Sequence, residues 1–276
     1  MDRVALVLGA GGARGLAHIH VLKAFDDLGV HPSVVAGTSI GSILGAAYCA
    51  GLSGAEIEEY VTNLFRARAR LISEAFKVRP SSLKGFLADG GFRLGELNLE
   101  SILSVFLPAE VPAKLEDLSI PLHVVATDYY ASTSAVFTSG DLRQSIAASA
   151  AMPAVFLPVM VQDRYYIDGS STNPCPLDTV QGLADHVLAV DVSGAPSGIP
   201  HTRPSKMDTM YASSQIMQKS IAKLMADAYP RSVLIHPSVA GYRSLDFLNA
   251  AQILAQTEPL REQVKSAIGA LLDSAP

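Results

Sequence analysis

The chain has 276 residues, of which 49% are hydrophobic, and its 21 basic and 26 acidic side chains give a net charge of −5. This length allows one large domain or two small ones. The acidic balance argues against nucleic acid as a partner, because phosphate binding usually requires a basic excess. Two cysteines, Cys49 and Cys175, predict no disulfide framework and favour a reducing compartment.

The first residues resemble a secretory signal only superficially, since the apolar run Val4–Leu8 is short and glycines follow it. No uninterrupted apolar run approaches the ~20 residues that a membrane-spanning helix needs. We therefore expect a soluble, cytoplasmic protein. Peripheral contact with the inner membrane surface stays open as an alternative.

The N-terminal region predicts alternating strands and helices. A strand at Val4–Leu8 leads through a glycine-rich loop into a helix whose apolar residues recur from Leu16 to Leu28. A second strand at Val34–Ala36 precedes a second helix at Ile40–Ala50. This order indicates a largely parallel sheet with right-handed crossovers, flanked by helices.

The middle of the chain continues the α/β pattern. Ser53 and Glu56 form a capping-box pattern at the start of another helix. The further predicted elements are a helix at Asn98–Leu107, strands at Pro121–Asp128 and Ala135–Thr138, a helix at Asp141–Ala151, a hairpin of Leu157–Val161 with Tyr165–Ile167, and a strand at Val187–Val192.

A Gly-, Pro- and Ser-rich segment at Ser193–Pro204 is the best candidate for a linker. We predict an α/β domain over residues 1–194 and a mostly helical extension over 195–276 that packs on it, with one short strand at Val233–Ile235. The segment Met207–Tyr229 carries an apolar stripe at near-helical spacing, which predicts a core helix. A lid or a membrane-facing helix is the alternative.

The glycine-rich loop GAGGARG, residues 9–15, follows the first strand. Its amides could hold a pyrophosphate, stabilise an oxyanion, or only form a tight turn. A dinucleotide site also requires an acidic residue at the end of the second strand. That strand ends instead in GTSIG, residues 37–41, so the pattern favours the oxyanion role.

The sequence GTSIG has the Gly-x-Ser-x-Gly pattern of a nucleophile elbow around Ser39. An ordinary helix N-cap is the alternative. The loop and the serine follow consecutive parallel strands, so they should lie side by side at the carboxyl edge of the sheet. An esterase needs this combination of a hydroxyl and oxyanion donors, which Gly11 and Gly12 can provide because no Cβ obstructs them.

The serine needs a base. In the order Ser–Asp–His, only His186, His201 and His236 could complete a triad, and none lies in a strong local pattern.

Three aspartates, Asp128, Asp168 and Asp191, each close an apolar strand, and a parallel sheet would bring them to the edge that carries Ser39. The residues alone do not choose among them, and two are expected to hold turns. The absence of metal-ligand spacings and of a Walker lysine predicts neither a metal nor another cofactor.

Together, GAGGARG, GTSIG, AASAAMPAVFLPV and YYIDGSSTNPCP resemble the patatin-like phospholipase family, of the bacterial type related to neuropathy target esterase catalytic domains. The resemblance covers roughly Val4 to Val192. It implies a patatin-like catalytic domain with a Ser–Asp dyad and no histidine, in which Ser39 is the nucleophile and Asp168 the base. The implied oxyanion hole comprises Gly11, Gly12, Ala13 and Arg14, and the supporting motif residues are Gly9, Gly15, Gly37, Gly41 and Gly169.

Two positions depart from the family pattern. Ala10 occupies the first place of the glycine triplet, and Ser170 follows Asp168-Gly169 where the family has a glycine or alanine. Both residues are small, so we expect an active enzyme.

The resemblance implies a carboxylic ester hydrolase of the phospholipase A or lysophospholipase type, acting on lipid acyl esters through an acyl-serine without a cofactor. The alternatives are a regulatory or adaptor protein with vestigial esterase activity and, less favoured, a nucleotide-binding oxidoreductase.

Overall fold

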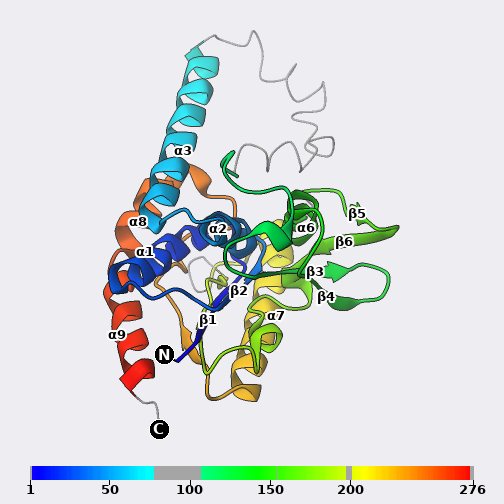
Figure 1. Cartoon of the computed structure of the whole chain (residues 1–276). Coiled ribbons are helices and arrows are strands. Elements are labelled where there is room, and N and C mark those ends of the chain that lie inside the picture. The colour runs from blue at the N-terminus through cyan, green and yellow to red at the C-terminus, as the bar shows by residue number, and fades with distance from the viewer. Residues whose placement is uncertain (1, 78–106, 154, 197–200, 274–276) are drawn as a thin grey trace.

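The computed structural model describes residues 2–77, 107–153, 155–196 and 201–273 (Figure 1). The predicted helix at Asn98–Leu107 lies almost entirely outside these residues. The helices and strands in chain order are β1 (Val4–Leu8), α1 (His18–Leu28), β2 (Val34–Thr38), α2 (Ile40–Cys49), α3 (Gly54–Lys77), β3 (Leu122–Asp128), β4 (Thr133–Phe137), α6 (Leu142–Ala150), β5 (Val159–Val161), β6 (Arg164–Asp168), β7 (His186–Val190), α7 (Lys206–Ala228), β8 (Val233–Ile235), α8 (Ala250–Thr257) and α9 (Leu260–Asp273).

Within the described residues, eight strands form one sheet in the order β5-β6-β3-β2-β1-β7-β8, with β4 also paired to β3. The strands from β3 to β8 along this order run parallel, whereas β4 and β6 pair antiparallel with β3, and β5 pairs antiparallel with β6. The prediction of a largely parallel sheet flanked by helices is confirmed. The predicted hairpin is also confirmed, and its two turn residues, Gln162 and Asp163, adopt positive φ.

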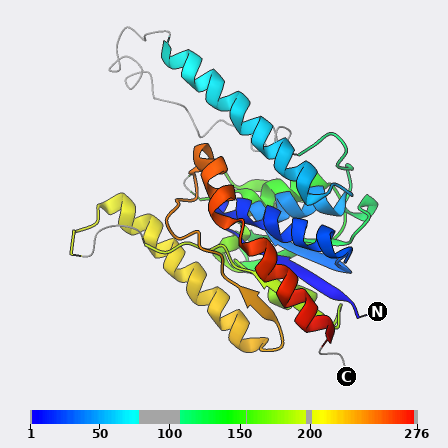
Figure 2. The same ribbon diagram turned by 90° about the vertical axis from the view of Figure 1, so that its left-hand side faces the viewer.

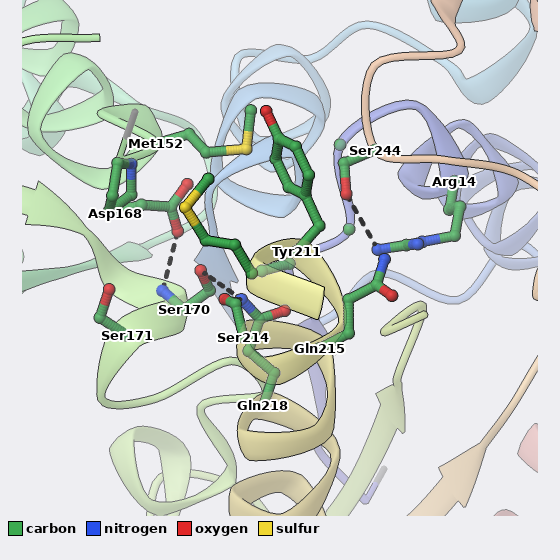
Figure 3. A pocket seen from close by; sticks show the side chains of 15 residues that line it. Arg14, Met152, Asp168, Ser170, Ser171, Tyr211, Ser214, Gln215, Gln218 and Ser244 are labelled. Carbon is green, nitrogen blue, oxygen red and sulfur yellow. Dashed lines mark hydrogen bonds between the residues drawn. The ribbon is translucent and has the colours of Figure 1, made fainter. Parts of the chain in front are cut away.

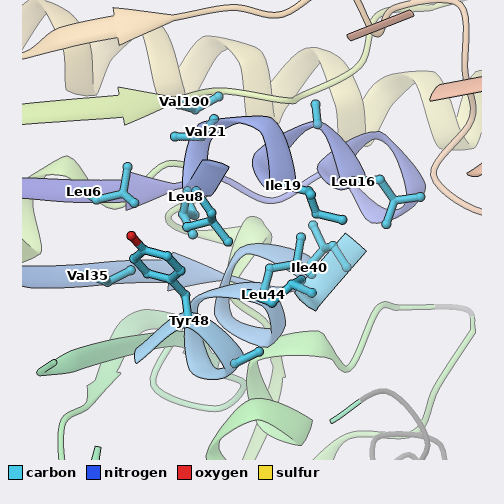
Figure 4. Packing of buried hydrophobic residues seen from close by; sticks show 14 of the residues in the cluster. Leu6, Leu8, Leu16, Ile19, Val21, Val35, Ile40, Leu44, Tyr48 and Val190 are labelled. Carbon is cyan, nitrogen blue, oxygen red and sulfur yellow. The ribbon is translucent and has the colours of Figure 1, made fainter. Parts of the chain in front are cut away.

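The two faces of the sheet carry separate cores because side chains alternate along each strand. Leu6 and Leu8 of β1 pack into a large cluster with α1, α2, α8 and α9, part of which is drawn in Figure 4. Ala5 and Val7 of the same strand face a smaller cluster that includes Ala222 of α7. Figure 2 accordingly shows α7 on the other side of the sheet from α1.

The C-terminal segment contributes to the sheet and to the main core. β8 pairs in parallel with β7, and Ile253, Val264 and Ile268 of α8 and α9 are fully buried. At about 1.5–3 kcal/mol for each buried aliphatic side chain, these helices add substantially to the stability of the fold.

The prediction that residues 207–229 form a core helix is wrong. Among the described side chains of α7, only Ala222 is buried, while Met210, Met217 and Leu224 are 48%, 59% and 68% exposed. The helix packs on the second cluster through Ala222, with Met225 and Ala226 partly buried against it, so most of the apolar stripe lies outside the core. No helix among the described residues has the length and apolarity needed to cross a membrane.

Candidate active site

Ser39 occupies a sharp turn between β2 and α2. Its backbone has φ 56° and ψ −121°, in the left-handed region that costs a non-glycine residue about 1–3 kcal/mol. Its side chain makes no capping hydrogen bond to α2, so the alternative of an ordinary N-cap is wrong. Ser39 is half-buried while its neighbours Thr38 and Ile40 are buried, as expected for a hydroxyl that projects from its own backbone.

The turn is held by hydrogen bonds on both sides of Ser39. The Ser39 amide donates to Ser149 Oγ at 2.9 Å, and Ser149 Oγ in turn donates to the Val125 carbonyl at 2.6 Å. The Ser39 carbonyl accepts from Ser42 Oγ at 2.7 Å. Ser149 lies on α6, so a helix distant in sequence fixes the strained backbone.

The two glycines of GTSIG are required by close packing. A Cβ on Gly37 would lie 2.6 Å from the carbonyl carbon of Gly41. A Cβ on Gly41 would lie 2.1 Å from the carbonyl oxygen of Leu8, at the start of the glycine-rich loop. The elbow and the loop therefore pack backbone against backbone.

Asp168 reaches the site from an antiparallel strand. We expected the strand before Asp168 to run parallel to the others, and this expectation is wrong, because β6 runs antiparallel to β3. β4 pairs with one edge of β3. On the other edge, β2 pairs with β3 as far as Val125, and β6 pairs with β3 from the next residue, Ala126, which is opposite Asp168. The ends of β2 and β6 therefore meet on one edge of β3.

Asp168 is buried, with 3% of its surface exposed. Its Oδ1 accepts from the Ser170 amide at 2.8 Å, and the nearby hydroxyls of Ser39 and Ser170 act to lower the pKa of the carboxyl group. Burial nevertheless raises the pKa of Asp168, because desolvation of the charged form outweighs these interactions.

The other two candidate aspartates hold turns, as expected for two of the three. Asp128 accepts from the Ala131 amide at 3.0 Å and pairs with Arg164. Asp191 accepts from the Ser193 amide at 2.8 Å and pairs with His236 at 3.3 Å.

None of the three candidate triad histidines takes part in the site. All seven histidines lie in the described part of the chain, and none lines the cavity beside Asp168. His186 is 3.6 Å from Asp2, and His201 lies exposed before α7. His236 is the partner of Asp191.

The glycine-rich loop leaves two amides without a partner. The amides of Gly9, Ala10 and Ala13 donate to the carbonyls of Val190, Pro174 and Ser244, respectively, at 2.8–3.0 Å. Within the described residues, the amides of Gly11 and Gly12 make no hydrogen bond. Gly12 has a φ of +59°, in the left-handed region that favours glycine.

Arg14 is buried beneath the loop and only 1% exposed. Its Nε donates to the Val192 carbonyl at 3.1 Å, Nη1 to the Tyr242 carbonyl at 3.3 Å, and Nη2 to Ser244 Oγ at 3.2 Å. Burial lowers the pKa of Arg14 to about 10, although Asp191 acts to raise it, so the guanidinium stays charged at neutral pH.

A cavity of about 190 Å³ lies between the loop and Asp168 (Figure 3). Its lining residues are Ala10, Gly11, Gly12, Arg14, Met152, Pro153, Asp168, Ser170, Ser171, Met210, Tyr211, Ser214, Gln215, Gln218 and Ser244. Ser39 is not among them, but it follows Thr38, which lies next to Asp168 along the edge of β3. The described residues contain no cluster of side chains suited to a metal ion.

The sequence did not predict that α7 forms one wall of this cavity. Met210, Tyr211, Ser214, Gln215 and Gln218 all line the cavity from this helix. The apolar stripe at 207–229 was the available signal, but it predicted burial in the core. Sequence reasoning also missed Ser149, which lies within the motif AASAAMPAVFLPV and has no spacing that would connect it to Ser39.

Comparison with known proteins identifies the family. The family model for patatin-like phospholipases matches residues 6–180, more than half of the chain. An uncharacterised NTE family protein of Mycobacterium tuberculosis is 34% identical over 198 residues, which cover 71% of this chain and 51% of that protein. Human patatin-like phospholipase domain-containing protein 6 is 34% identical over 195 residues, covering 69% of this chain and 13% of that protein.

Neuropathy target esterase sws of Drosophila melanogaster is 33% identical over 205 residues, which cover 69% of this chain and 13% of that protein. The chain thus matches about half of the mycobacterial relative and a smaller share of the animal proteins. The matched region includes the elbow, the glycine-rich loop and the strand that ends at Asp168. The chain belongs to the patatin-like phospholipase family.

Proposed function

We propose that this protein is a serine lipid hydrolase that cleaves carboxylic esters of phospholipids or lysophospholipids through an acyl-serine intermediate. The observation that carries this proposal is the placement of Ser39, in its strained elbow, beside the buried carboxylate of Asp168, because β2 and β6 end on consecutive residues of β3. The names of the relatives, a phospholipase domain protein and an esterase, support the lipid ester as substrate.

In the acylation step, Asp168 takes the proton of the Ser39 hydroxyl as Oγ attacks the ester carbonyl carbon. The carbonyl oxygen becomes an oxyanion, and the unpartnered amides of Gly11 and Gly12 are the proposed donors to it. The intermediate collapses, the C–O bond to the alcohol breaks, and Asp168 returns its proton to the leaving oxygen.

In the deacylation step, water attacks the acyl-serine while Asp168 accepts a proton from it. Collapse of the second intermediate releases the fatty acid, and the proton passes from Asp168 to Ser39 Oγ. A carboxylate is an intrinsically weaker base than an imidazole, with a reference pKa of ~3.9 against ~6.5. The burial that raises the pKa of Asp168 makes it a better base for this role.

The oxyanion donors in this proposal are fewer than the sequence suggested. The Ala13 amide already donates to Ser244, and the Arg14 guanidinium is directed to Val192, Tyr242 and Ser244. We therefore assign the oxyanion to Gly11 and Gly12, and give Arg14 a role in holding the loop.

A fluorophosphonate probe tests the proposal. Wild-type protein should be labelled at Ser39 and should release fatty acid from lysophospholipid or phospholipid micelles, whereas Ser39→Ala should do neither. Ser220→Ala is the control, since Ser220 is an exposed serine of α7 that does not line the cavity and donates to the Ile216 carbonyl at 2.9 Å. Absence of labelling and of ester hydrolysis in the wild-type protein would refute the proposed function.

A further inference from the structure

The loop between β8 and α8 contacts the glycine-rich loop directly. We call residues 242–244 the strap, and they lie beyond residue 180, where the family match ends. The Ser244 carbonyl accepts from the Ala13 amide at 2.8 Å. A Cβ on Gly12 would lie 2.2 Å from the same carbonyl oxygen, so the strap backbone is in contact with Gly12 as well.

Arg14 binds the strap from beneath the loop. Its guanidinium donates to Ser244 Oγ at 3.2 Å and to the Tyr242 carbonyl at 3.3 Å. With Gly12 and Ala13, three consecutive residues of the glycine-rich loop thus touch the strap. Figure 3 shows Arg14 and Ser244 on the side of the cavity away from Asp168.

The strap is itself held in place. The Arg243 amide donates to the Asp246 carboxylate at 2.7 Å, which closes a turn. The hydroxyl of Tyr242 donates to Gln256 Oε1 at 2.8 Å, which connects the strap to α8. Because α8 packs in the main core, the strap is a fixed support for the loop.

From these contacts we propose that the strap is a positioning element that orients the Gly11 and Gly12 amides toward the oxyanion, with Ser244 as its principal residue. This inference rests on the proposed function. A glycine-rich loop with a positive φ has many accessible conformations, so its amides need an external constraint to stay aligned. By engaging the Ala13 amide and clamping Arg14, Ser244 fixes the peptide unit between Gly12 and Ala13, which restricts the two preceding units that carry the Gly11 and Gly12 amides.

Ser244→Ala removes the acceptor for Arg14 but keeps the carbonyl that binds Ala13, so it tests the side-chain clamp. We expect kcat for a soluble p-nitrophenyl ester to fall about tenfold with KM within twofold, a smaller loss than the 10²–10³-fold caused by deleting an oxyanion donor. Arg14→Lys should show a larger fall in kcat, because a lysine cannot donate to both the Tyr242 carbonyl and Ser244 Oγ as the guanidinium does. Ser244→Thr, which keeps a hydroxyl, should recover most of the lost kcat.

Ser238→Ala is the matched control. Ser238 is an exposed serine on the same β8–α8 segment, and its carbonyl accepts from Gln256 at 2.8 Å. This variant should keep kcat within twofold of the wild-type value. Thermal unfolding of every variant separates a loss of alignment from a loss of fold, and if Arg14→Lys does not fold, the two Ser244 variants carry the test.

Inhibitor binding distinguishes positioning from a purely structural role. Affinity for a trifluoromethyl ketone, which forms a tetrahedral adduct, should fall by the same factor as kcat, while affinity for the fatty acid product stays unchanged. Unchanged kcat and ketone affinity in an active Ser244→Ala variant would overturn the strap proposal and leave the proposed function intact. A wild-type protein without esterase activity would instead refute the proposed function, and the strap proposal with it.

Discussion

Thr38 and Asp168 meet end to end along one edge of β3, where they pair with the consecutive residues Val125 and Ala126. β2 arrives at this point running parallel to β3, and β6 arrives running antiparallel to it. The residue after Thr38 is Ser39, so the register of two strands brings the hydroxyl to the carboxylate. This arrangement requires no histidine, and it leads to the first prediction.

Ser39→Ala and Asp168→Asn should each reduce ester hydrolysis by more than about 10³-fold while leaving the circular dichroism spectrum unchanged. Each removes one of the two groups to which we assign the proton transfer. His186→Ala, His201→Ala and His236→Ala should retain activity within about threefold. A loss in any histidine variant comparable to that in Asp168→Asn would show that the base is a histidine.

The pH dependence of activity should reflect the environment of Asp168. Since the proposed base, Asp168, must be ionised and burial raises its pKa, kcat/KM should fall on acidification with a midpoint above the ordinary value of ~3.9. Ser170→Ala should move this midpoint further up, because the Ser170 hydroxyl stabilises the charged carboxylate. A steady-state pH–rate profile of both proteins checks the order of the two midpoints.

The raised pKa of Asp168 favours its role as a base but lowers the stability of the fold at neutral pH. A raised folded-state pKa means that the stabilisation from protonated Asp168 is complete below the unfolded value of ~3.9 and is lost as the pH rises through the folded value. At pH 7 the buried charge therefore costs stability, and the neutral Asp168→Asn variant should unfold at a higher temperature than wild type. The difference should shrink toward pH 4, and melting curves at both pH values measure it.

Ser149→Ala should separate positioning of the elbow from general stability. The substitution removes the acceptor for the Ser39 amide and leaves the strained backbone free to relax, so kcat should fall about 10- to 100-fold. It should also cost about 1–3 kcal/mol of unfolding free energy.

Ser145→Ala is the control for Ser149→Ala, because Ser145 is a buried serine one turn earlier on α6 and donates to the Asp141 carbonyl at 2.8 Å. The control should be destabilised but keep its kcat. Equal kcat losses in the two variants would contradict a specific role for Ser149.

Gly41→Ala should destabilise the protein severely. Its Cβ would lie 2.1 Å from the Leu8 carbonyl oxygen, a backbone atom that cannot move without displacing β1. We expect a cost of at least about 3 kcal/mol or a loss of soluble protein. Gly45→Ala, on the next turn of α2, would meet only side-chain atoms, of Leu122, Val35 and Leu8 at 3.3–3.6 Å, and should cost less than half as much by urea denaturation.

Met217→Ser and Leu224→Ser on α7 should leave the unfolding temperature within about 2 °C of wild type, because both side chains are more than half exposed. If the protein takes its substrate from a lipid surface, as we propose, these exposed apolar side chains are suited to contact it. The double variant should then sediment less with phosphatidylcholine vesicles at unchanged activity on a soluble ester. Full sedimentation of the double variant would exclude α7 as the contact.

The local chemistry of this protein is largely determined by its sequence. GTSIG predicted a serine elbow because close backbone packing around a strained turn admits only glycine at positions 37 and 41. The parallel strands β1 and β2, and the hairpin before Asp168, followed from apolar periodicity and turn residues. Choosing Asp168 among three aspartates depended on the family resemblance, since all three close apolar strands and composition does not distinguish them.

Tertiary structure decided what depends on contacts between distant segments. The antiparallel direction of β6, the exposure of α7 and the contact of Ser244 with the glycine-rich loop have no local signal, because residues far apart in sequence create them. A stripe of apolar side chains has the same spacing whether it faces a core or a cavity, so periodicity could not locate α7. The amides of the glycine-rich loop that stay unpaired are those not facing a carbonyl of Val190, Pro174 or Ser244. These three residues are far from the loop in sequence, so only the folded chain brings them to it.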